Sequence, residues 1–281
     1  MDLETVREVV LARDRADLAQ LDAGSAVLAG GTFLFSEPHD HLDRLIDITA
    51  LGWAPLRAHA DGLEIAATCT LAELAGAAPG RELGSALLRP DWPGTALFAQ
   101  ACRALLASHK IWRTATVGGN VCLSLPAGAV LGALVALDAT AVIWPRGGGE
   151  RRIPLRDFVT GPGENILATG AVVRSFLVPT ASLLARTSFR KIALAPLGRS
   201  GAVVMGRRTA DGRCAITVTA ATTRPVVLEF AAVPADFEVA AALAELEPDV
   251  WFDDPHGAPD WRAHVTALLA AEVAAELGEA A

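Results

Sequence analysis

Two glycine pairs, each followed closely by a hydroxyl or amide side chain, are the residues best suited to bind a ligand. The first, Gly30-Gly31-Thr32, ends the apolar run AVLA, and the second lies in TATVGGN, from Thr114 to Asn120. Glycine tolerates positive φ and leaves no side chain over the backbone, so successive N–H groups can point together at an anion. Either pair alone could be an ordinary turn between a strand and a helix. Two such segments in one chain could instead hold the two ends of one extended ligand, such as a dinucleotide with its diphosphate.

The common dinucleotide-binding signatures are missing from this sequence. No G-x-G-x-x-G follows a predicted strand and no G-x-x-x-x-G-K-[ST] occurs, so neither the Rossmann fingerprint nor the P-loop is present. GPGEN, which begins at Gly161, starts like the former but lacks its third glycine. A dinucleotide bound by the two glycine segments would therefore be held in another fold.

The elements that must position these segments predict an α+β protein. Hydrophobic periodicity, turn residues and β-branched runs separate helices from strands, and Thr70 is well placed as the N-cap of a helix. We expect helices over residues 3–21, 71–75 and 95–107, and strands over 26–30, 45–49, 63–67, 151–154 and 171–179. We also expect a buried segment over 131–144 and a loop over the Pro- and Gly-rich stretch 79–94.

The last hundred residues have a different texture. Residues 188–195, 201–209 and 214–222 alternate like antiparallel strands, with Asp211-Gly212 as a hairpin turn, and an amphipathic helix is expected over 261–277. We therefore predict a first domain over 1–178, made of subdomains at about 1–52 and 53–178, and a smaller C-terminal domain with an antiparallel sheet and helices over 179–281.

Composition excludes several classes of protein. The net charge is -8, and only two of the 24 basic residues are lysines, Lys110 and Lys191, so no basic face for nucleic acid is expected. The longest apolar stretch is interrupted by Asp138, which argues against membrane insertion. Four widely spaced cysteines, at positions 69, 102, 122 and 214, form no C-x-x-C pair, so an iron–sulfur cluster or zinc site in this chain is not expected. We expect a cytoplasmic protein with reduced thiols.

Taken together, AGGTFLF, SHKIWRTATVGGNVCLSLPAGA, RRIPLRDFVTGP and FLVP followed by SFRK resemble the FAD-binding, or medium, subunit of the molybdenum hydroxylases, the group that includes carbon monoxide dehydrogenase and the FAD domain of xanthine dehydrogenase. The resemblance covers essentially the whole chain in the expected order. It implies an FAD-binding fold of the PCMH type in two subdomains, followed by a smaller domain.

The resemblance also implies a set of cofactor-binding positions. The first FAD loop is matched by Ala29, Gly30, Gly31, Thr32, Phe33 and Leu34, and the second by Thr116, Val117, Gly118, Gly119 and Asn120. Leu106 and Ala107 match positions near the flavin end. Val173 matches a position on a strand that lines the cofactor, and Lys191 matches a basic residue beside it. FAD brings about two negative charges, so a chain of net charge -8 must bind it with local amide dipoles and a few placed cations. No catalytic and no metal-binding residue is expected.

Some positions depart from the family pattern. Family members usually continue from TVGGN toward D-P-x-x-D, whose last acid bonds the adenosine part of FAD, whereas this chain has Ala129 there. One lost hydrogen bond costs about 0.5–1.5 kcal/mol, which would weaken FAD binding without abolishing it. Phe33 stands where a polar residue is common, and the chain has no Tyr that could cover the flavin. The stretch EPHDHLD, with His39 and His41, is expected to be an exposed loop or helix start rather than a metal site.

The resemblance implies an electron-transfer role. The FAD-binding subunit of such a complex would take electrons from [2Fe–2S] clusters on a small partner subunit, which receives them from a molybdopterin centre on a large partner subunit, and pass them to NAD, a quinone or oxygen. A dimer of heterotrimers is the expected assembly. Two alternatives stay open: a free-standing flavin oxidoreductase on the same fold, and a scaffold subunit that has lost FAD, as the departures at Ala129 and Phe33 allow.

Overall fold

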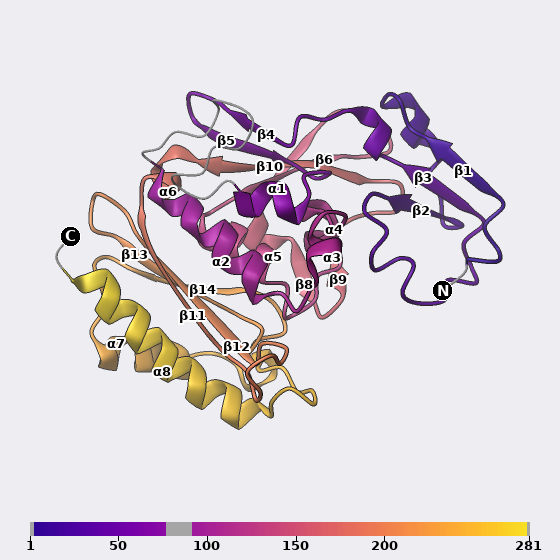
Figure 1. Cartoon of the computed structure of the whole chain (residues 1–281). Coiled ribbons are helices and arrows are strands. Elements are labelled where there is room, and N and C mark those ends of the chain that lie inside the picture. Colours follow the sequence, from indigo (N-terminus) through magenta and orange to yellow (C-terminus); the bar gives the residue numbers. More distant parts are fainter. Residues whose placement is uncertain (1–2, 77–91, 280–281) are drawn as a thin grey trace.

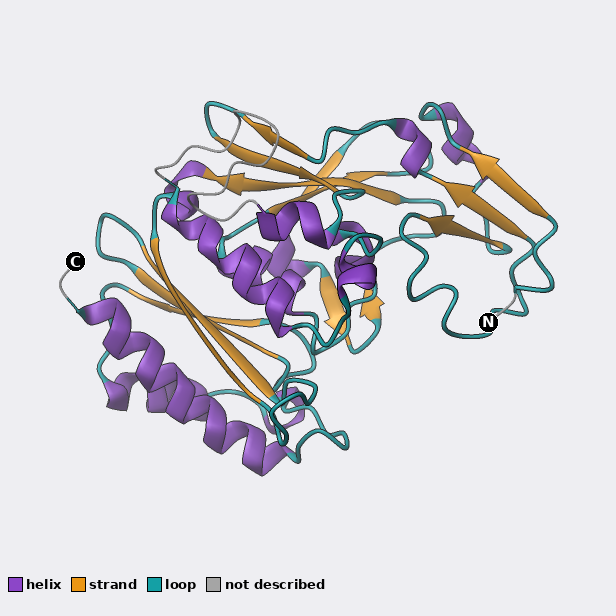
Figure 2. Cartoon of the chain, viewed as in Figure 1, coloured by secondary structure: helices purple, strands orange, loops and turns teal. Residues whose placement is uncertain are grey.

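The structure, a computed structural model, describes residues 3–76 and 92–279. Three main β-sheets follow one another along the chain, and helices lie between and below them (Figures 1 and 2). The first sheet is parallel, in the order β1-β3-β2, and consists of Glu8–Leu11 (β1), Ser25–Leu28 (β2) and Arg44–Asp47 (β3). Most of the expected loop over 79–94 lies outside the described residues.

The helix expected over residues 3–21 is wrong. Glu8–Leu11 forms β1, and only Ala16–Gln20 is helical, as a 3-10 turn. The β-branched pair Val9-Val10 favours a strand, and β1 gains a parallel partner in β3, with Val10 opposite Ile46. Pairing with a strand more than thirty residues away thus overrides the local periodicity.

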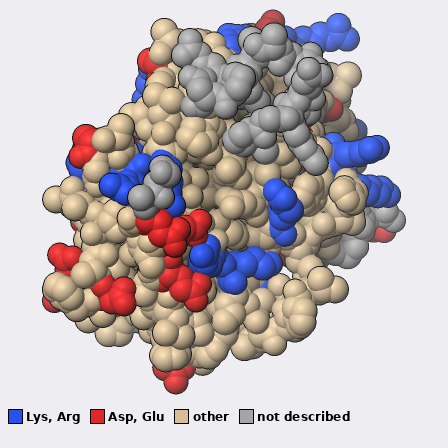
Figure 3. All heavy atoms as spheres, turned by 60° about the vertical axis from the view of Figure 1, so that its left-hand side comes forward, with Lys and Arg blue, Asp and Glu red and all other residues tan. Residues whose placement is uncertain are grey.

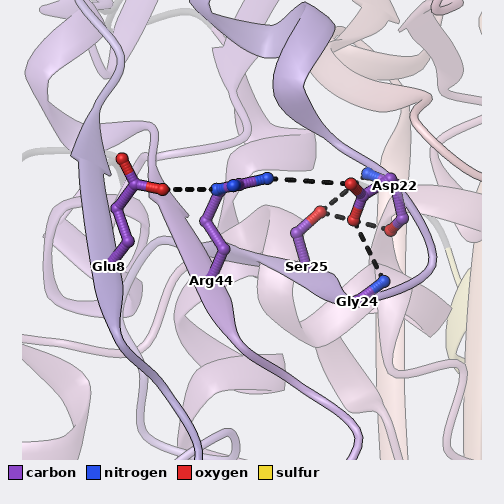
Figure 4. Close-up of polar contacts among 5 residues, drawn as sticks. All are labelled: Glu8, Asp22, Gly24, Ser25 and Arg44. Atoms are coloured by element: carbon purple, nitrogen blue, oxygen red, sulfur yellow. Dashed lines mark hydrogen bonds and ion pairs between the residues drawn. The ribbon is translucent and has the colours of Figure 1, made fainter.

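A single arginine ties the three strands of this sheet together at one end (Figure 4). Arg44 Nε lies 2.7 Å from Glu8 on β1, and its Nη1 lies 3.7 Å from Asp22, whose own backbone and side chain bond Ser25 and Gly24 at the start of β2. These contacts fix where β2 begins, and the first glycine pair follows directly at its other end.

The second sheet is antiparallel, in the order β4-β5-β10-β6-β7. Helices pack on it, and α5 is buried along its whole length. The strands are Leu56–Ala58 (β4), Gly62–Ala66 (β5), Thr140–Trp144 (β6), Arg151–Pro154 (β7) and Val172–Pro179 (β10), and a small pair comprises Val159–Gly161 (β8) and Glu164–Asn165 (β9). The helices are Leu71–Gly76 (α1), Ala96–Ala104 (α2), His109–Trp112 (α3), Val117–Cys122 (α4), Ala129–Ala136 (α5) and Thr180–Leu183 (α6).

Two predicted local signals are confirmed in these regions. The Thr70 hydroxyl accepts the N–H of Glu73, and the Glu73 carboxylate accepts the N–H of Thr70, which is a complete capping box at the start of α1. Gly212, in the predicted hairpin turn, has φ +89° and donates to Thr209.

The third sheet is an antiparallel meander, β11-β12-β13-β14, with α8 and α7 on one face and α2 and α5 on the other (Figure 1). Its strands are Arg186–Ile192 (β11), Ala202–Arg208 (β12), Cys214–Thr219 (β13) and Val226–Phe230 (β14), and its helices are Asp236–Ala244 (α7) and Pro259–Gly278 (α8). The α+β fold class is confirmed. The boundary at 178/179 stays a prediction; β10 ends at Pro179, and the third sheet begins with β11.

Stacked tryptophan and arginine side chains join the first sheet to the second. The Arg174 guanidinium, on β10, lies 4.4 Å from the ring centroid of Trp53 and 5.9 Å from that of Trp144. The Arg15 guanidinium lies 4.7 Å from the ring centroid of Trp144. Cation–π contacts of this kind are stronger where water is excluded, as around the half-buried Arg174. The stack thus connects the segments that follow β1 and β3 to β6 and β10 of the second sheet.

Charged groups are mixed rather than gathered on the face of the molecule that Figure 3 shows. On the face shown in Figure 3, basic side chains lie in separate groups, several of them beside acidic ones, with no continuous basic area. None of the described helices is both long and apolar enough to cross a membrane.

One buried arginine organises the C-terminal part. Arg262, on α8, is 1% exposed and donates to the carbonyls of Gly201, Gly257 and Ala220 and to the Asp254 carboxylate. It therefore satisfies groups on three separate loops at once.

We predict that Arg262→Met lowers the free energy of unfolding by about 3–5 kcal/mol, because it leaves a carboxylate and three carbonyls without their donor. Urea denaturation followed by circular dichroism measures the change. Arg213→Met is the matched control, because Arg213 is 73% exposed and its pair with Asp211 should contribute at most about 1 kcal/mol. Equal, small losses for both variants would contradict the assignment.

Candidate functional site

A pocket of about 700 Å³ lies where the end of β2, the start of α4, β10 and the loop before β12 meet. Its volume falls in the range of small-molecule and cofactor sites. Thirteen of the fifteen predicted cofactor-binding positions line it: Ala29, Gly30, Gly31, Thr32, Phe33, Leu34, Leu106, Ala107, Thr116, Gly118, Gly119, Asn120 and Val173. The structure thus brings together segments that lie far apart in the sequence.

Gly30 is where the two glycine segments touch. A Cβ added at Gly30 would lie 2.0 Å from the carbonyl oxygen of Thr114 and 3.1 Å from the Cα of Ala115. Only glycine allows that approach of two backbones. Gly31 has φ +66°, so the chain turns sharply after β2 and enters the following loop.

The first loop exposes a row of unused backbone donors. Among the described residues, no acceptor receives the N–H of any residue from Gly30 to Leu34. The loop is closed instead by Phe35 N–H to Gly31 oxygen and Ser36 N–H to Phe33 oxygen. Successive free N–H groups beside a pocket are what an anion-binding nest requires, and anion binding by this segment stays a prediction.

The second segment is built differently from the first, contrary to our expectation that both repeat the same chemistry. The N–H groups of Val117 and Gly118 donate to the carbonyls of Cys69 and Ala67, and those of Gly119 and Asn120 donate to Thr116. The segment begins α4 rather than an open loop, with Thr116 as N-cap. A Cβ at Gly118 would lie 2.7 Å from Ala67, so this glycine serves close packing.

What the second segment offers a ligand is its side chains. The Asn120 Oδ1 accepts the N–H of Leu131 at the start of α5, which leaves its amide group as a donor toward the pocket. The Thr116 hydroxyl accepts from Gly119 and retains its own proton to donate. The lining therefore combines residues with free backbone donors and residues with side-chain donors.

Two predicted positions lie outside the pocket lining. Val117, the first residue of α4, is fully buried in the hydrophobic core. Lys191 is exposed on β11. A contact of either residue with the cofactor stays a prediction.

Three polar residues of the lining escape the sequence reasoning. Arg199 and Ser200 come from the loop before β12, in the C-terminal part of the chain, where no motif marks them among so many arginines. His39, expected on an exposed loop or helix start, is partly buried and lines the pocket. The expectation that EPHDHLD is no metal site stays a prediction, although no His, Cys, Asp and Glu cluster suited to a metal occurs among the described residues.

The lining carries little charge. Arg199 is its one formal cation, and it contains no Asp or Glu among the described residues. Burial raises the pKa of the Cys122 thiol to about 12, so this lining group is neutral as well. Ala129, the position at which the resemblance implies an acid in relatives, is 1% exposed and lies outside the lining. The pocket therefore presents amide donors and apolar walls without repelling an anion.

A scan against protein-family models matches residues 7–181 to the FAD-binding domain in molybdopterin dehydrogenase. The chain belongs to this family. A search of curated proteins found no significant match. The matched region contains the first sheet, the second sheet and both glycine segments.

Solved structures agree on the fold over nearly the whole flavin-binding chain. A chain of quinoline 2-oxidoreductase from Pseudomonas putida 86 matches at a TM-score of 0.78 and 16% identity, covering 99% of this chain and 98% of its own. A chain of carbon monoxide dehydrogenase from Oligotropha carboxidovorans matches at 0.80 and 17%, covering 97% of each. One from Hydrogenophaga pseudoflava, in an enzyme that lacks the Mo-pyranopterin moiety of its molybdenum cofactor, matches at 0.76 and 19%, covering 97% and 98%.

We predict that Gly30→Ala separates the two glycine segments. The added methyl group has no room against the Thr114 carbonyl, so the free energy of unfolding should fall by about 1–3 kcal/mol and FAD affinity by at least about tenfold. Denaturant unfolding and flavin fluorescence titration measure the two effects.

The control is Gly147→Ala, where no atom lies within 4 Å of the added Cβ. Stability should stay within about 0.5 kcal/mol of the parent, with unchanged FAD binding. A Gly30→Ala protein that behaves like this control would rule out the close approach as a constraint on the site.

Proposed function

We propose that the chain is the FAD-binding electron-transfer subunit of a molybdenum-containing hydroxylase or dehydrogenase. The observation that carries this proposal is the row of free N–H groups from Gly30 to Leu34 on the wall of a pocket without carboxylates. Such a row suits the dianionic diphosphate of FAD, and family membership points to the same cofactor.

The residues present fit FAD, and each wall has its own task. The amides of Gly30 to Leu34 would bind the diphosphate, while the Asn120 amide and the Thr116 hydroxyl would donate to polar groups of the cofactor. Leu106, Val173 and other apolar residues would exclude water from the flavin. When bound, FAD would supply the redox chemistry at its isoalloxazine ring, and the protein supplies binding, orientation and electrostatics.

The cysteines support placing the iron–sulfur clusters on another chain. Burial raises the pKa of Cys102 to about 12 and that of Cys214 to about 11, and the Cys69 thiol is shifted well upward by the same cause. Thiols that resist deprotonation and do not cluster are poor ligands for iron. We propose a [2Fe–2S] small subunit and a molybdopterin large subunit as partners, in a dimer of heterotrimers, with NAD, a quinone or oxygen as electron acceptor.

The rival readings differ in what they require of the pocket. A scaffold subunit without FAD is suggested by Ala129, which offers no hydrogen bond to the adenosine part. One such bond is worth about 1 kcal/mol, so its loss would weaken FAD binding only modestly. The N–H groups of the first loop all remain available to a ligand. A free-standing flavin oxidoreductase would need catalytic acid or base groups near the flavin, and the lining offers no carboxylate among the described residues.

We predict saturable binding of one FAD per chain by the purified protein. Titration should quench flavin fluorescence, and the bound cofactor should appear in the visible spectrum. Riboflavin, which lacks the diphosphate, should bind at least about tenfold more weakly, because the first loop then has no anion to hold. Absence of bound flavin with FAD in large excess would sink the proposal in favour of the scaffold.

We also predict that affinity purification of the tagged chain from its native cells recovers a complex containing both iron and molybdenum. Metal analysis and visible spectroscopy of the complex check this, with the untagged strain as control. A flavin-loaded chain that purifies alone and oxidises a small organic substrate would instead favour the free-standing enzyme.

A further inference from the structure

We infer that His39 is a further cofactor-binding residue, which donates a hydrogen bond from Nε2 to the diphosphate of FAD. The inference rests on the proposed function and extends it to a residue outside both glycine segments. It assigns to the loop between β2 and β3 a side-chain donor in addition to its backbone donors.

One ring nitrogen of His39 is buried without a partner in the described part of the chain. His39 lines the 700 Å³ pocket, and its Nε2 atom is buried and has no hydrogen-bond partner among the described residues. Buried polar atoms without partners are rare, because the lost hydrogen bond to water is not replaced. A ligand that accepts a hydrogen bond at this point would restore it.

His39 lies on the same loop as the backbone donors. His39 and the free N–H groups of Gly30 to Leu34 belong to one loop, which leaves β2 and returns to β3 along the pocket wall. Its carbonyl accepts the N–H of Leu42, and its ring lies edge-on to that of His41, with 6.1 Å between centroids. His41 is exposed and lies outside the lining, so the two neighbouring histidines differ in access to the pocket.

The pocket lining offers little positive charge to balance a diphosphate. The diphosphate of FAD carries about two negative charges, and the lining supplies one formal cation among the described residues, Arg199, from the chain's C-terminal part. An imidazole can donate from Nε2 as the neutral tautomer or as the cation, and the cation would add a second positive charge. No carboxylate in the lining competes for it among the described residues.

A metal at this histidine is the other chemistry that its neighbours suggest. Asp40, His41 and Asp43 lie close in sequence, yet no group of three His, Cys, Asp or Glu suited to a metal occurs among the described residues. His39 faces the pocket while Asp40 and His41 are exposed. The geometry therefore favours an acceptor inside the pocket.

The test compares His39→Leu, His39→Gln and the neighbouring control His41→Leu. FAD dissociation constants come from fluorescence titration, and phosphorus NMR of FAD at saturation reports on the two phosphates directly. We expect His39→Leu to raise the dissociation constant about ten- to a hundredfold and to shift the phosphate resonances. His39→Gln keeps a donor and should retain most of the affinity, and His41→Leu should change neither observable.

Thermal unfolding of the FAD-free proteins separates binding from folding. His39→Leu should unfold at the same temperature as the parent or slightly higher, because an unpaired buried nitrogen is removed. Parental FAD affinity in His39→Leu, unchanged phosphate resonances, or a loss of stability in the FAD-free protein that accounts for the weaker binding would each overturn the inference. Failure of the unmodified chain to bind FAD would overturn the proposed function itself, which is a different result.

Discussion

The contact between Gly30 and the backbone of Thr114 and Ala115 is the constraint on which the site depends. The residues that follow Thr114 are fixed to the second sheet, because Leu71 donates to the Ala115 carbonyl and Val117 and Gly118 donate to Cys69 and Ala67. Gly30 in turn follows closely after the strand β2, which Arg44 and Asp22 hold in the first sheet. One glycine without a side chain therefore lets two sheets share a single pocket wall.

The pocket is lined by parts of the chain that belong to different hydrophobic cores, and each part contributes a different kind of group. The first loop supplies backbone donors, the start of α4 supplies side-chain donors, and Arg199 supplies charge from the strand connection of the third sheet. The cation–π stack of Arg15, Trp144, Arg174 and Trp53 links the first sheet to the second. The third part is held by Pro126, whose carbonyl accepts from both Thr219 and Ala220.

Local signals in the sequence predicted local structure well. The N-cap at Thr70, the turn at Gly212 and the glycine segments all depend on neighbouring residues. The structure confirms the first two and brings most residues of the glycine segments together at one pocket. The helix predicted over residues 3–21 was wrong because Val9 and Val10 pair with β3, and the periodicity of a sequence does not show which distant strand a segment pairs with. The donors of Val117 and Gly118 looked free for the same reason, since their acceptors lie on another segment. His39 and Arg199 needed the folded pocket to be recognised at all.

The way in which the first loop offers its donors has an evolutionary consequence. An N–H group is present whatever the side chain, so a site that binds through the main chain from Gly30 to Leu34 leaves most of these positions free to change. Phe33 can stand where relatives have a polar residue, provided that the loop keeps its path. Selection then acts on the course of the backbone more than on residue identity. This freedom is consistent with a shared fold at only 16–19% identity.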